Sequence, residues 1–460
     1  MKPLRLPIAV LLAVISFASM PITGAAAVFS LGDSGAAIAA SPAAPDSGAD
    51  GDDLAPTAAA PWNPPRPVSS AEPWETALGI PLRIATFPLS LLRLGLEGRL
   101  LQVEEASLVP RVRAAFTMAP RIGVGVLPAS LGDRTGLGAT LHARPLLLGG
   151  WLGADLSGST HDYARTRADL GQGPARLTYA YDWRPRERFF DVSLGTSHAV
   201  ASTYAARTRR ITLSLAYPWS EPGRRPPRGQ IGIWAGPREM ILRRGREAPS
   251  FDAAFPGTAG LLDRRQEHFI YGTRLALDRR AGAPHWSHGF RAAAEVERFG
   301  KQIETLSIRD GRTEAPQFTR MSFEGEGAVS FMRDPRTLRF LVRVVKQTGR
   351  TGTAPRLIPD LMGLGGHQGL SGFEPGRFHD VDLVLGKLGY VFSLARHVEF
   401  ELHAESGGVY PELERARLST FKSSFGVALR PRSAWAPLAS LGIDWSSESV
   451  RLRYSLGGVE

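Results

Sequence analysis

The chain has 460 residues, no cysteine and a net charge of +11, from 55 lysines and arginines against 44 aspartates and glutamates. The lack of cysteine excludes disulfides, thiolate catalysis, iron–sulfur clusters and an acylated lipoprotein anchor. A hydrophobic content of 43% is too low for a helical membrane transporter and too high for a wholly disordered chain. The arginines are scattered along the chain rather than clustered, so we expect no nucleic-acid partner.

Residues 1–27 have the pattern of a secretory signal peptide. Lys2 and Arg5 form a positive start, residues 6–20 form an apolar stretch, and three alanines at 25–27 offer a small-residue cleavage site. The apolar stretch is short for a membrane-spanning helix, and no later segment is long and apolar enough to span as one. Export without a helical span leaves a soluble periplasmic or secreted protein, or an outer-membrane barrel.

Residues 28–72 are rich in Ala, Pro, Gly, Ser and Asp, and their six acids and one arginine give a net charge of −5. Such a segment cannot bury enough apolar surface to offset its chain entropy, so we predict a disordered linker. Without the +2 of residues 1–27 and this −5, residues 73–460 carry +14. The linker contains Gly32-Asp33-Ser34-Gly35, as some serine proteases do around the nucleophile, but a disordered segment supplies no positioned histidine or oxyanion hole.

Residues 73–106 are predicted to be an amphipathic helical segment, interrupted by Pro81 and Pro88. One face could carry the apolar side chains Leu78, Leu82, Phe87, Leu91, Leu92 and Leu96. That face could pack on the main domain, or it could make 73–97 an interfacial or plugging helix. The sequence leaves both alternatives open.

From residue 107 the hydrophobic pattern changes to alternation, which is typical of β-strands. The clearest segments are 384–394, 398–405 and 450–456. Their polar faces mix charges of both signs, as in the hydrated interior of a membrane barrel whose apolar face meets lipid. Lipid tolerates no unpaired backbone, so the sheet should close. We therefore predict an all-β fold for 107–460, a transmembrane antiparallel β-barrel that has about 16 strands at roughly 22 residues per strand and connection.

A glycine-rich stretch interrupts the strand pattern at 358–373, where the sequence reads IPDLMGLGG and then, from Leu370, LSGF. About 30 residues on, 403–407 reads HAESG. These motifs resemble the bacterial surface antigen superfamily, the BamA- and TamA-like outer-membrane assembly barrels, whose signatures are LGG…(L/V)RG(F/Y) in the sixth extracellular loop and F-x-D-x-G on a strand. Weaker similarities at 184–195 and 271–280 extend the resemblance over most of 107–460. The sequence departs from that family's plan because only the linker and the helical segment precede the predicted barrel, so we expect a member without POTRA domains.

The resemblance implies that loop 363–380 folds back into the barrel and meets the acid of the strand motif. Its implied loop residues are Gly365, Gly366, Leu370, Ser371, Gly372, Phe373 and Arg377, and its implied wall residues are Glu405 and Gly407. Ser371 stands where the family has arginine, so the charged contact with Glu405 cannot form there, and Arg377 is the candidate replacement. By alternation alone Glu405 faces the lumen, where it either needs a cation or hydrogen-bond donors or is one of many solvated charges.

Two transport functions remain open. The resemblance implies insertion or translocation of polypeptides at the outer membrane, through a lateral seam between the first strand, at about 107–118, and residues 449–456. Exposed strand edges template incoming strands in general. Outer-membrane lipids and unfolded outer-membrane or secreted polypeptides would be the partners, with no periplasmic accessory protein identified. The alternative is a passive diffusion channel, whose lumen arginines would favour anions.

An outer-membrane lipase or protease is the third hypothesis. His161, His367 and His379 could serve, and His161 and His379 each precede an aspartate. Such an enzyme needs serine and histidine at one height on one wall, and the sequence shows no such pairing. We expect no enzymatic activity, no catalytic residues and no cofactor. We also expect no metal site, because no His/Asp/Glu cluster has ligand spacing.

Overall fold

The computed structural model describes part of the chain, and all of that part belongs to one compact unit within 64–460. The predicted signal peptide, linker, helical segment and first strand at about 107–118 lie outside the described residues. The described residues are 124–129, 138–143, 146–147, 150–192, 194–195, 201–219, 229–245, 249–255, 262–263, 265–280, 288–301, 316–331, 336–351, 358–366, 369–395, 398–431 and 439–456.

Strands make up nearly all of the regular structure in these ranges. The long strands come from the alternating segments of the sequence, and short helical turns occupy some of the connections. The strands are β1 (Val124–Ala129), β2 (Gly138–Ala143), β3 (Leu146–Leu147), β4 (Gly150–Ser159), β5 (Ala164–Gln172), β6 (Ala175–Phe189), β7 (Ser202–Trp219), β8 (Gly229–Arg244), β9 (Arg265–Asp278), β10 (Gly289–Lys301), β11 (Gln317–Phe331), β12 (Arg336–Thr351), β13 (Met362–Leu364), β14 (Phe378–Asp380), β15 (Asp382–Ala395), β16 (Val398–Tyr410), β17 (Lys422–Pro431), β18 (Ala439–Ser446) and β19 (Val450–Leu456). The helical turns are α4 (Phe251–Ala254), η5 (Ile358–Asp360), η6 (Leu413–Arg415) and η7 (Leu418–Thr420).

One antiparallel sheet of seventeen strands contains all of these strands except β13 and β14, which pair with each other. Along the sheet each strand pairs with the next sheet strand in the chain, from β1–β2 to β18–β19, except that β2 and β3 both pair with β4. Strands β2 and β3 lie end to end opposite β4, so the number of side-by-side positions agrees with the prediction of about 16 strands. The predicted all-β, antiparallel architecture is confirmed.

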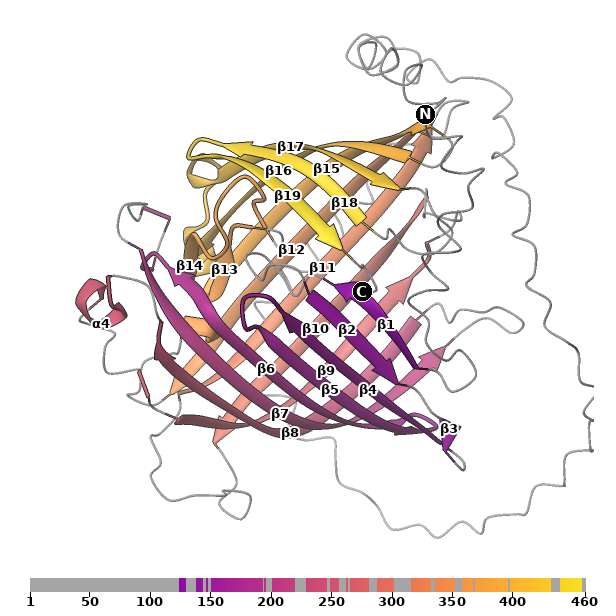
Figure 1. Ribbon diagram of the computed structural model, residues 1–460, viewed down its shortest axis with the longest axis vertical. Helices are drawn as coiled ribbons and strands as arrows, with labels where there is room; N and C mark the ends of the chain where they lie inside the picture. The colour runs from indigo at the N-terminus through magenta and orange to yellow at the C-terminus, as the bar shows by residue number, and fades with distance from the viewer. Residues whose placement is uncertain are drawn as a thin grey trace, which may run out of the picture. The chain divides into compact units, whose positions relative to one another are not determined.

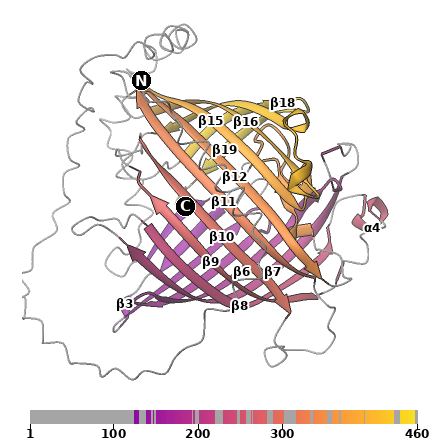
Figure 2. The same ribbon diagram turned by 180° about the vertical axis from the view of Figure 1, so that it is seen from behind.

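The two ends of the sheet approach each other without pairing. Some Cα atoms of β1 and β19 lie within 8 Å of one another, yet within the described residues no hydrogen-bonded register joins the two strands. Figure 1 shows β19 and β1 at the facing ends of the curved sheet, and Figure 2 shows the continuous wall through β9, β10, β11 and β12 from behind. Within the described residues, strand pairing therefore does not close the sheet, whereas the sequence predicts a closed one.

Alternation gives the sheet an apolar outer face and a polar inner face. On β7, Ile211 and Leu213 are exposed while Thr212 between them is buried. The same register exposes large apolar side chains on most other strands. They include Leu156, Leu170, Leu177, Leu215, Tyr217, Ile231, Ile233, Tyr271, Leu275, Phe290, Val296, Val329, Phe340, Leu388, Phe425, Leu441, Ile443, Val450, Leu452 and Tyr454. Soluble monomers rarely expose apolar surface of this extent.

Connections alternate between the two ends of the sheet. At one end they include the short segments 148–149, 173–174, 332–335 and 396–397. At the other they include 245–264 and 352–381, the two longest connections between successive strands of the described sheet. We call these the short-turn end and the long-loop end. In the part of the chain that the structure describes, no helix has the length and apolar character needed to cross a membrane.

Candidate functional site

The connection 352–381 between β12 and β15, which we call the inner loop, contains η5, β13 and β14. It turns sharply at Gly365 and Gly366, whose φ angles of 117° and 75° lie in the left-handed region that other L-residues rarely adopt. Gly365 also has no space for a side chain, because a Cβ atom would lie 2.2 Å from the carbonyl oxygen of Glu374. Two of the glycines in the predicted loop motif are thus required by the backbone path.

Ser371, at the tip of the inner loop, binds Glu405 on β16. Its backbone N–H and its hydroxyl donate to Glu405 Oε2 at 2.6 and 2.7 Å, and Ser424 Oγ of β17 donates to the same oxygen at 2.9 Å. Lys387 Nζ on β15 donates to Glu405 Oε1 at 2.9 Å. Glu405 is only 3% exposed, so these donors supply the compensation that a buried carboxylate needs.

Lys387 supplies the positive charge that an arginine at position 371 would have brought. It lies directly opposite Glu405 in the β15–β16 register. Both residues belong to the polar faces that alternation identifies, so a correct pairing of 384–394 with 398–405 would have found this contact. Sequence reasoning looked for the cation in the loop, and the cation lies on the wall.

A buried histidine–aspartate pair lies beside Ser371 and crosses an intervening strand. His403 Nε2 on β16 is 2.7 Å from Asp444 Oδ1 on β18, and both side chains are fully buried. Gly426 on β17 lies between them in register, and a Cβ atom there would be 2.0 Å from Asp444 Oδ1. Arg453 Nε of β19 lies 3.0 Å from Asp444 Oδ2. The missing side chain of Gly426 therefore allows β16, β18 and β19 to be linked on the inner face.

Ser371, His403 and Asp444 are the residue types of a hydrolase triad, but their geometry differs from one. Ser371 Oγ lies 3.4 Å from His403 Nε2, the same nitrogen that contacts Asp444. In a triad the acid orients the histidine through the other ring nitrogen, and the serine gives its proton to the histidine. The Ser371 hydroxyl instead donates to Glu405. The arrangement is therefore that of a structural network.

Of the histidines proposed from the sequence, His161 and His379 lie on other elements than Ser371, His403 and Asp444. His379 is buried in β14 and packs against Phe189 with 5.4 Å between ring centroids. His161 lies in the turn after β4, and position 367 lies outside the described residues. No group of three or more His, Asp or Glu side chains among the described residues is placed to hold a metal ion.

Arg377 pairs with a different acid, Glu448, in the turn between β18 and β19. Its Nε and Nη2 atoms donate to the two carboxylate oxygens at 2.7 and 2.9 Å. The guanidinium carbon lies 4.7 Å from the ring centroid of Phe378 and 5.3 Å from that of Phe190. The Arg377 side chain is 3% exposed. This two-pronged, stacked geometry is the one in which arginine binds carboxylates most strongly.

The backbone of the loop tip is bound by the same hairpin. The carbonyl oxygen of Gly372 accepts hydrogen bonds from Ser446 Oγ at 2.8 Å and Ser449 Oγ at 2.9 Å, and Arg451 donates to the carbonyl oxygen of Phe373. A Cβ atom on Gly372 would lie 2.6 Å from backbone atoms of β18. Glycine at this position therefore permits the close approach.

Apolar packing fills the space around these polar contacts. Leu370, Phe373 and Phe378 of the inner loop are fully buried and belong to one cluster with Leu383 and Val409 of the wall. Phe373 packs edge to face on Phe378 with 5.2 Å between centroids. The wall motif also contributes at Gly407, where a Cβ atom would lie 2.4 Å from the carbonyl oxygen of residue 384. The predicted loop and wall residues thus lie in one buried assembly.

Asp360 ties the start of the inner loop to three strands, β8, β11 and β12. Its Oδ1 is 2.8 Å from Arg238 Nη2 on β8, and its carbonyl oxygen accepts from Arg320 Nη2 on β11 at 3.1 Å and from Gln347 Nε2 on β12 at 2.8 Å. Burial alone would raise the pKa of Asp360, but Arg238, His268 and Arg320 together hold it below its ordinary value. Sequence reasoning missed this contact because nothing local marks Asp360 as the partner of a strand 122 residues earlier.

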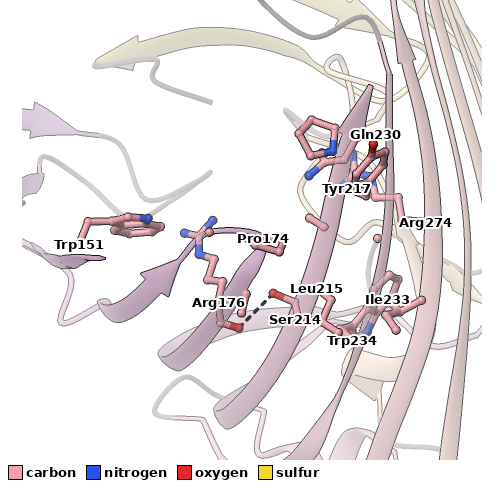
Figure 3. Close-up of a pocket in the computed structure, with 15 residues that line it drawn as sticks. Trp151, Pro174, Arg176, Ser214, Leu215, Tyr217, Gln230, Ile233, Trp234 and Arg274 are labelled. Atoms are coloured by element: carbon pink, nitrogen blue, oxygen red, sulfur yellow. Dashed lines mark hydrogen bonds between the residues drawn. The ribbon is translucent and has the colours of Figure 1, made fainter. Parts of the chain in front are cut away.

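A cavity of about 700 Å³ lies at the short-turn end of the sheet, beside the 173–174 turn. Figure 3 shows Trp151 and Arg176 on one side of it and Trp234 and Arg274 on the other. Ser214 Oγ donates to the carbonyl oxygen of Arg176 at 3.2 Å. The described lining contains no carboxylate and no histidine, so the cavity offers no general base from its own walls.

Comparisons with known proteins bear on the fold. No protein-family model matches the chain, and no curated protein matches it. Among solved structures, BamA from Haemophilus ducreyi lacking POTRA domains 1–3 is similar, with a TM-score of 0.50 and 11% identity over 73% of this chain and 70% of that one. The fold is that of a BamA-like β-barrel whose first and last described strands are not paired.

Two further structures are CdiB from Acinetobacter baumannii and CdiB from Escherichia coli. Both have TM-scores of 0.44 over 73% of this chain, with identities of 12% and 13%. The match spans 59% and 62% of their lengths, less than two thirds of either protein.

Proposed function

We propose that the protein is an integral outer-membrane β-barrel that inserts or translocates polypeptides. The inner loop is the observation that carries this proposal. Asp360 holds the loop to β8, β11 and β12, and Ser371 and Arg377 hold it to β16 and the β18–β19 hairpin. A loop tied to opposite walls by buried charges occupies the interior as part of the fold. A passive diffusion channel needs a continuous water path, which such a loop opposes.

The outer surface supports the membrane assignment. Its exposed leucines, isoleucines, valines and aromatic residues would meet lipid, while the mixed charges of the inner face stay hydrated. The longer connections gather at one end of the sheet, as the extracellular loops of outer-membrane barrels do. We therefore assign the long-loop end to the cell exterior and the short-turn end, with the cavity, to the periplasm.

The unpaired ends of the sheet support a polypeptide as the client. Strands β1 and β19 approach within 8 Å without a hydrogen-bonded register in the described residues. A strand edge that presents free N–H and C=O groups is a template for another strand. We propose that an unfolded outer-membrane or secreted polypeptide adds a strand at this seam. Backbone hydrogen bonds drive that step, so we propose no enzymatic role, no catalytic residue and no cofactor.

Two measurements test the proposal. We expect depletion of the protein to lower the amounts of other outer-membrane proteins, measured by quantitative proteomics of isolated outer membranes with an unrelated barrel as depletion control. An unchanged outer membrane would contradict an assembly role. In planar bilayers we expect no stable large pore from the purified protein, and a pore from a variant that lacks residues 369–376. A stable, open and anion-selective pore from the unaltered protein would instead support the diffusion channel.

A further inference from the structure

The last hairpin, β18–β19, has β17 as its strand neighbour, and on the inner face it contacts both His403 of β16 and the inner loop. Strand β18 pairs with β17, and β19 pairs with β18. On the inner face the inner loop binds the hairpin through Gly372, Phe373 and Arg377. The loop therefore supplies a lateral attachment for the hairpin that does not depend on β1.

The same segment of the loop also reaches the N-terminal half of the sheet. Glu374 accepts a hydrogen bond from Arg188 Nη1 of β6 at 2.7 Å, and a parallel bridge joins Val192, just after β6, to His379. Arg377 lies over the ring of Phe190. Residues 371–379 thus contact both the N-terminal part of the sheet, at β6, and the β18–β19 hairpin at its other end. These are the parts of the sheet whose end strands, β1 and β19, are not paired with each other.

We infer that Arg377 is a positioning residue that fastens the last hairpin to the inner loop and so controls when the edge of β19 becomes available to a client strand. The second half of this inference rests on the proposed function. Arg377 suits the role because two nitrogen atoms of its guanidinium group donate hydrogen bonds to Glu448 in the turn. Two aromatic rings also pack against the guanidinium group and restrict its orientation. Removing Arg377 takes away the contact of the inner loop with Glu448 but leaves the β17–β18 and β18–β19 ladders in place.

Hydrogen exchange measured by mass spectrometry on the full-length protein in lipid vesicles tests the fastening. We expect Arg377→Ala and Glu448→Ala to speed exchange in 439–456 by ~10-fold, the factor that corresponds to loss of about 1.4 kcal/mol of local protection. Exchange in β9–β11 should stay unchanged. The charge-reversed pair R377E/E448R should recover part of the protection. Arg415→Ala is the matched control, because Arg415 pairs with Glu412 in an exposed contact at 66% and 61% exposure.

Two exchange results would overturn the fastening. One is unchanged exchange in 439–456 in a folded Arg377→Ala variant. The other is an equal increase in β9–β11, which would show a general loss of stability rather than release of the hairpin. Either result can be obtained whether or not the protein assembles other barrels, so it is independent of the proposed function.

The rate at which an unfolded outer-membrane barrel folds into vesicles containing the protein tests the control of the edge. Arg377→Ala should raise this rate at least ~3-fold, because a looser hairpin exposes the β19 edge more often. If the wild-type protein accelerates folding and Arg377→Ala gives the same rate, Arg377 does not control access to the β19 edge. A wild-type protein that gives no acceleration at all would refute the proposed function, and hydrogen exchange would still decide the fastening.

Discussion

Gly426→Ala is a one-carbon change at the centre of the inner-face network. Gly426 faces the interior between His403 and Asp444, whose 2.7 Å contact crosses β17 through the space that a side chain would occupy. The added Cβ atom would lie 2.0 Å from Asp444 Oδ1, 2.5 Å from His403 Nε2 and 2.6 Å from His403 Cε1. Both partners have fully buried side chains, so their contact must lengthen or break to admit the methyl group.

Two costs set the magnitude. A hydrogen bond to a charged group contributes about 1.5–3 kcal/mol, and overpacking a filled interior by a methyl group costs about 1–3 kcal/mol. The movement that relieves the steric clash also breaks the His403–Asp444 contact. The two energetic costs are therefore partly the same and do not add in full. We expect the free energy of unfolding to fall by about 2–4 kcal/mol.

Equilibrium unfolding by urea in detergent micelles, followed by tryptophan fluorescence, measures this difference. Gly386→Ala on β15 is the control, because a Cβ atom there meets only the carbonyl oxygen of Ser406 at an ordinary 3.8 Å. The control should be neutral or stabilise by up to about 1 kcal/mol, since alanine restricts the unfolded chain. In a His403→Ala background the cost of Gly426→Ala should fall by more than half, because the side chains that collide are coupled.

Equal effects of Gly426→Ala and Gly386→Ala would refute the steric reasoning. A large Gly426→Ala effect that persists unchanged in the His403→Ala background would place the cost elsewhere, in the backbone of β17.

Changes in the inner loop give further tests by urea unfolding at several pH values. Asp360→Asn leaves Arg238 buried without its charge partner, so we expect a loss of about 3–5 kcal/mol at pH 7. Because folding lowers the pKa of Asp360, its carboxylate stabilises the fold in full above the pKa of the unfolded chain, near 3.9. This stabilisation is lost as pH falls through the pKa of the folded protein. Wild-type stability should therefore fall more steeply than that of Asp360→Asn below about pH 4, and parallel curves would contradict this. Burial lowers the pKa of His379 to about 4. Between about pH 6.5 and 4 the histidine therefore binds a proton in the unfolded chain but not in the folded protein, so the free energy of unfolding declines as pH falls through this range. The decline should be about 3 kcal/mol and absent in His379→Gln, whereas equal slopes for both proteins would refute it.

The strand faces could be predicted because their signal is local. On β16 the alternation of Glu399, Glu401, His403 and Glu405 with apolar residues fixes one face within eight residues, whatever strand lies beside it. The long loop could be located from its glycine-rich motif, and Gly365 and Gly366 have backbone angles that favour glycine. The strand faces and the loop depend on residues that are close together in the sequence, so a single sequence is enough to predict them.

The partners across the interior could not be predicted, because they depend on register and curvature. Arg377 meets Glu448, 71 residues away, and Asp360 meets a strand on the other side of the sheet. A shift of one residue in the register of β18 would turn Asp444 outward and remove the contact with His403. Lys387 was visible as a polar-face residue, but its pairing with Glu405 needs the relative register of β15 and β16.

In the proposed function, the unpaired ends of the described sheet give the inner loop a physical role. Unpaired backbone groups in hydrocarbon cost several kcal/mol each, so an open edge between β1 and β19 would be strongly driven to close or to accept another strand in the proposed membrane. Without contacts on its inner face, the hairpin would be held by β17 alone and could move toward either outcome. The contacts of Gly372, Phe373 and Arg377 fix its position from the inside, which keeps the edge close to β1 without committing it to a permanent pairing. In the proposed function, such an edge would bind a client strand and release it again, which a fully hydrogen-bonded barrel would not do.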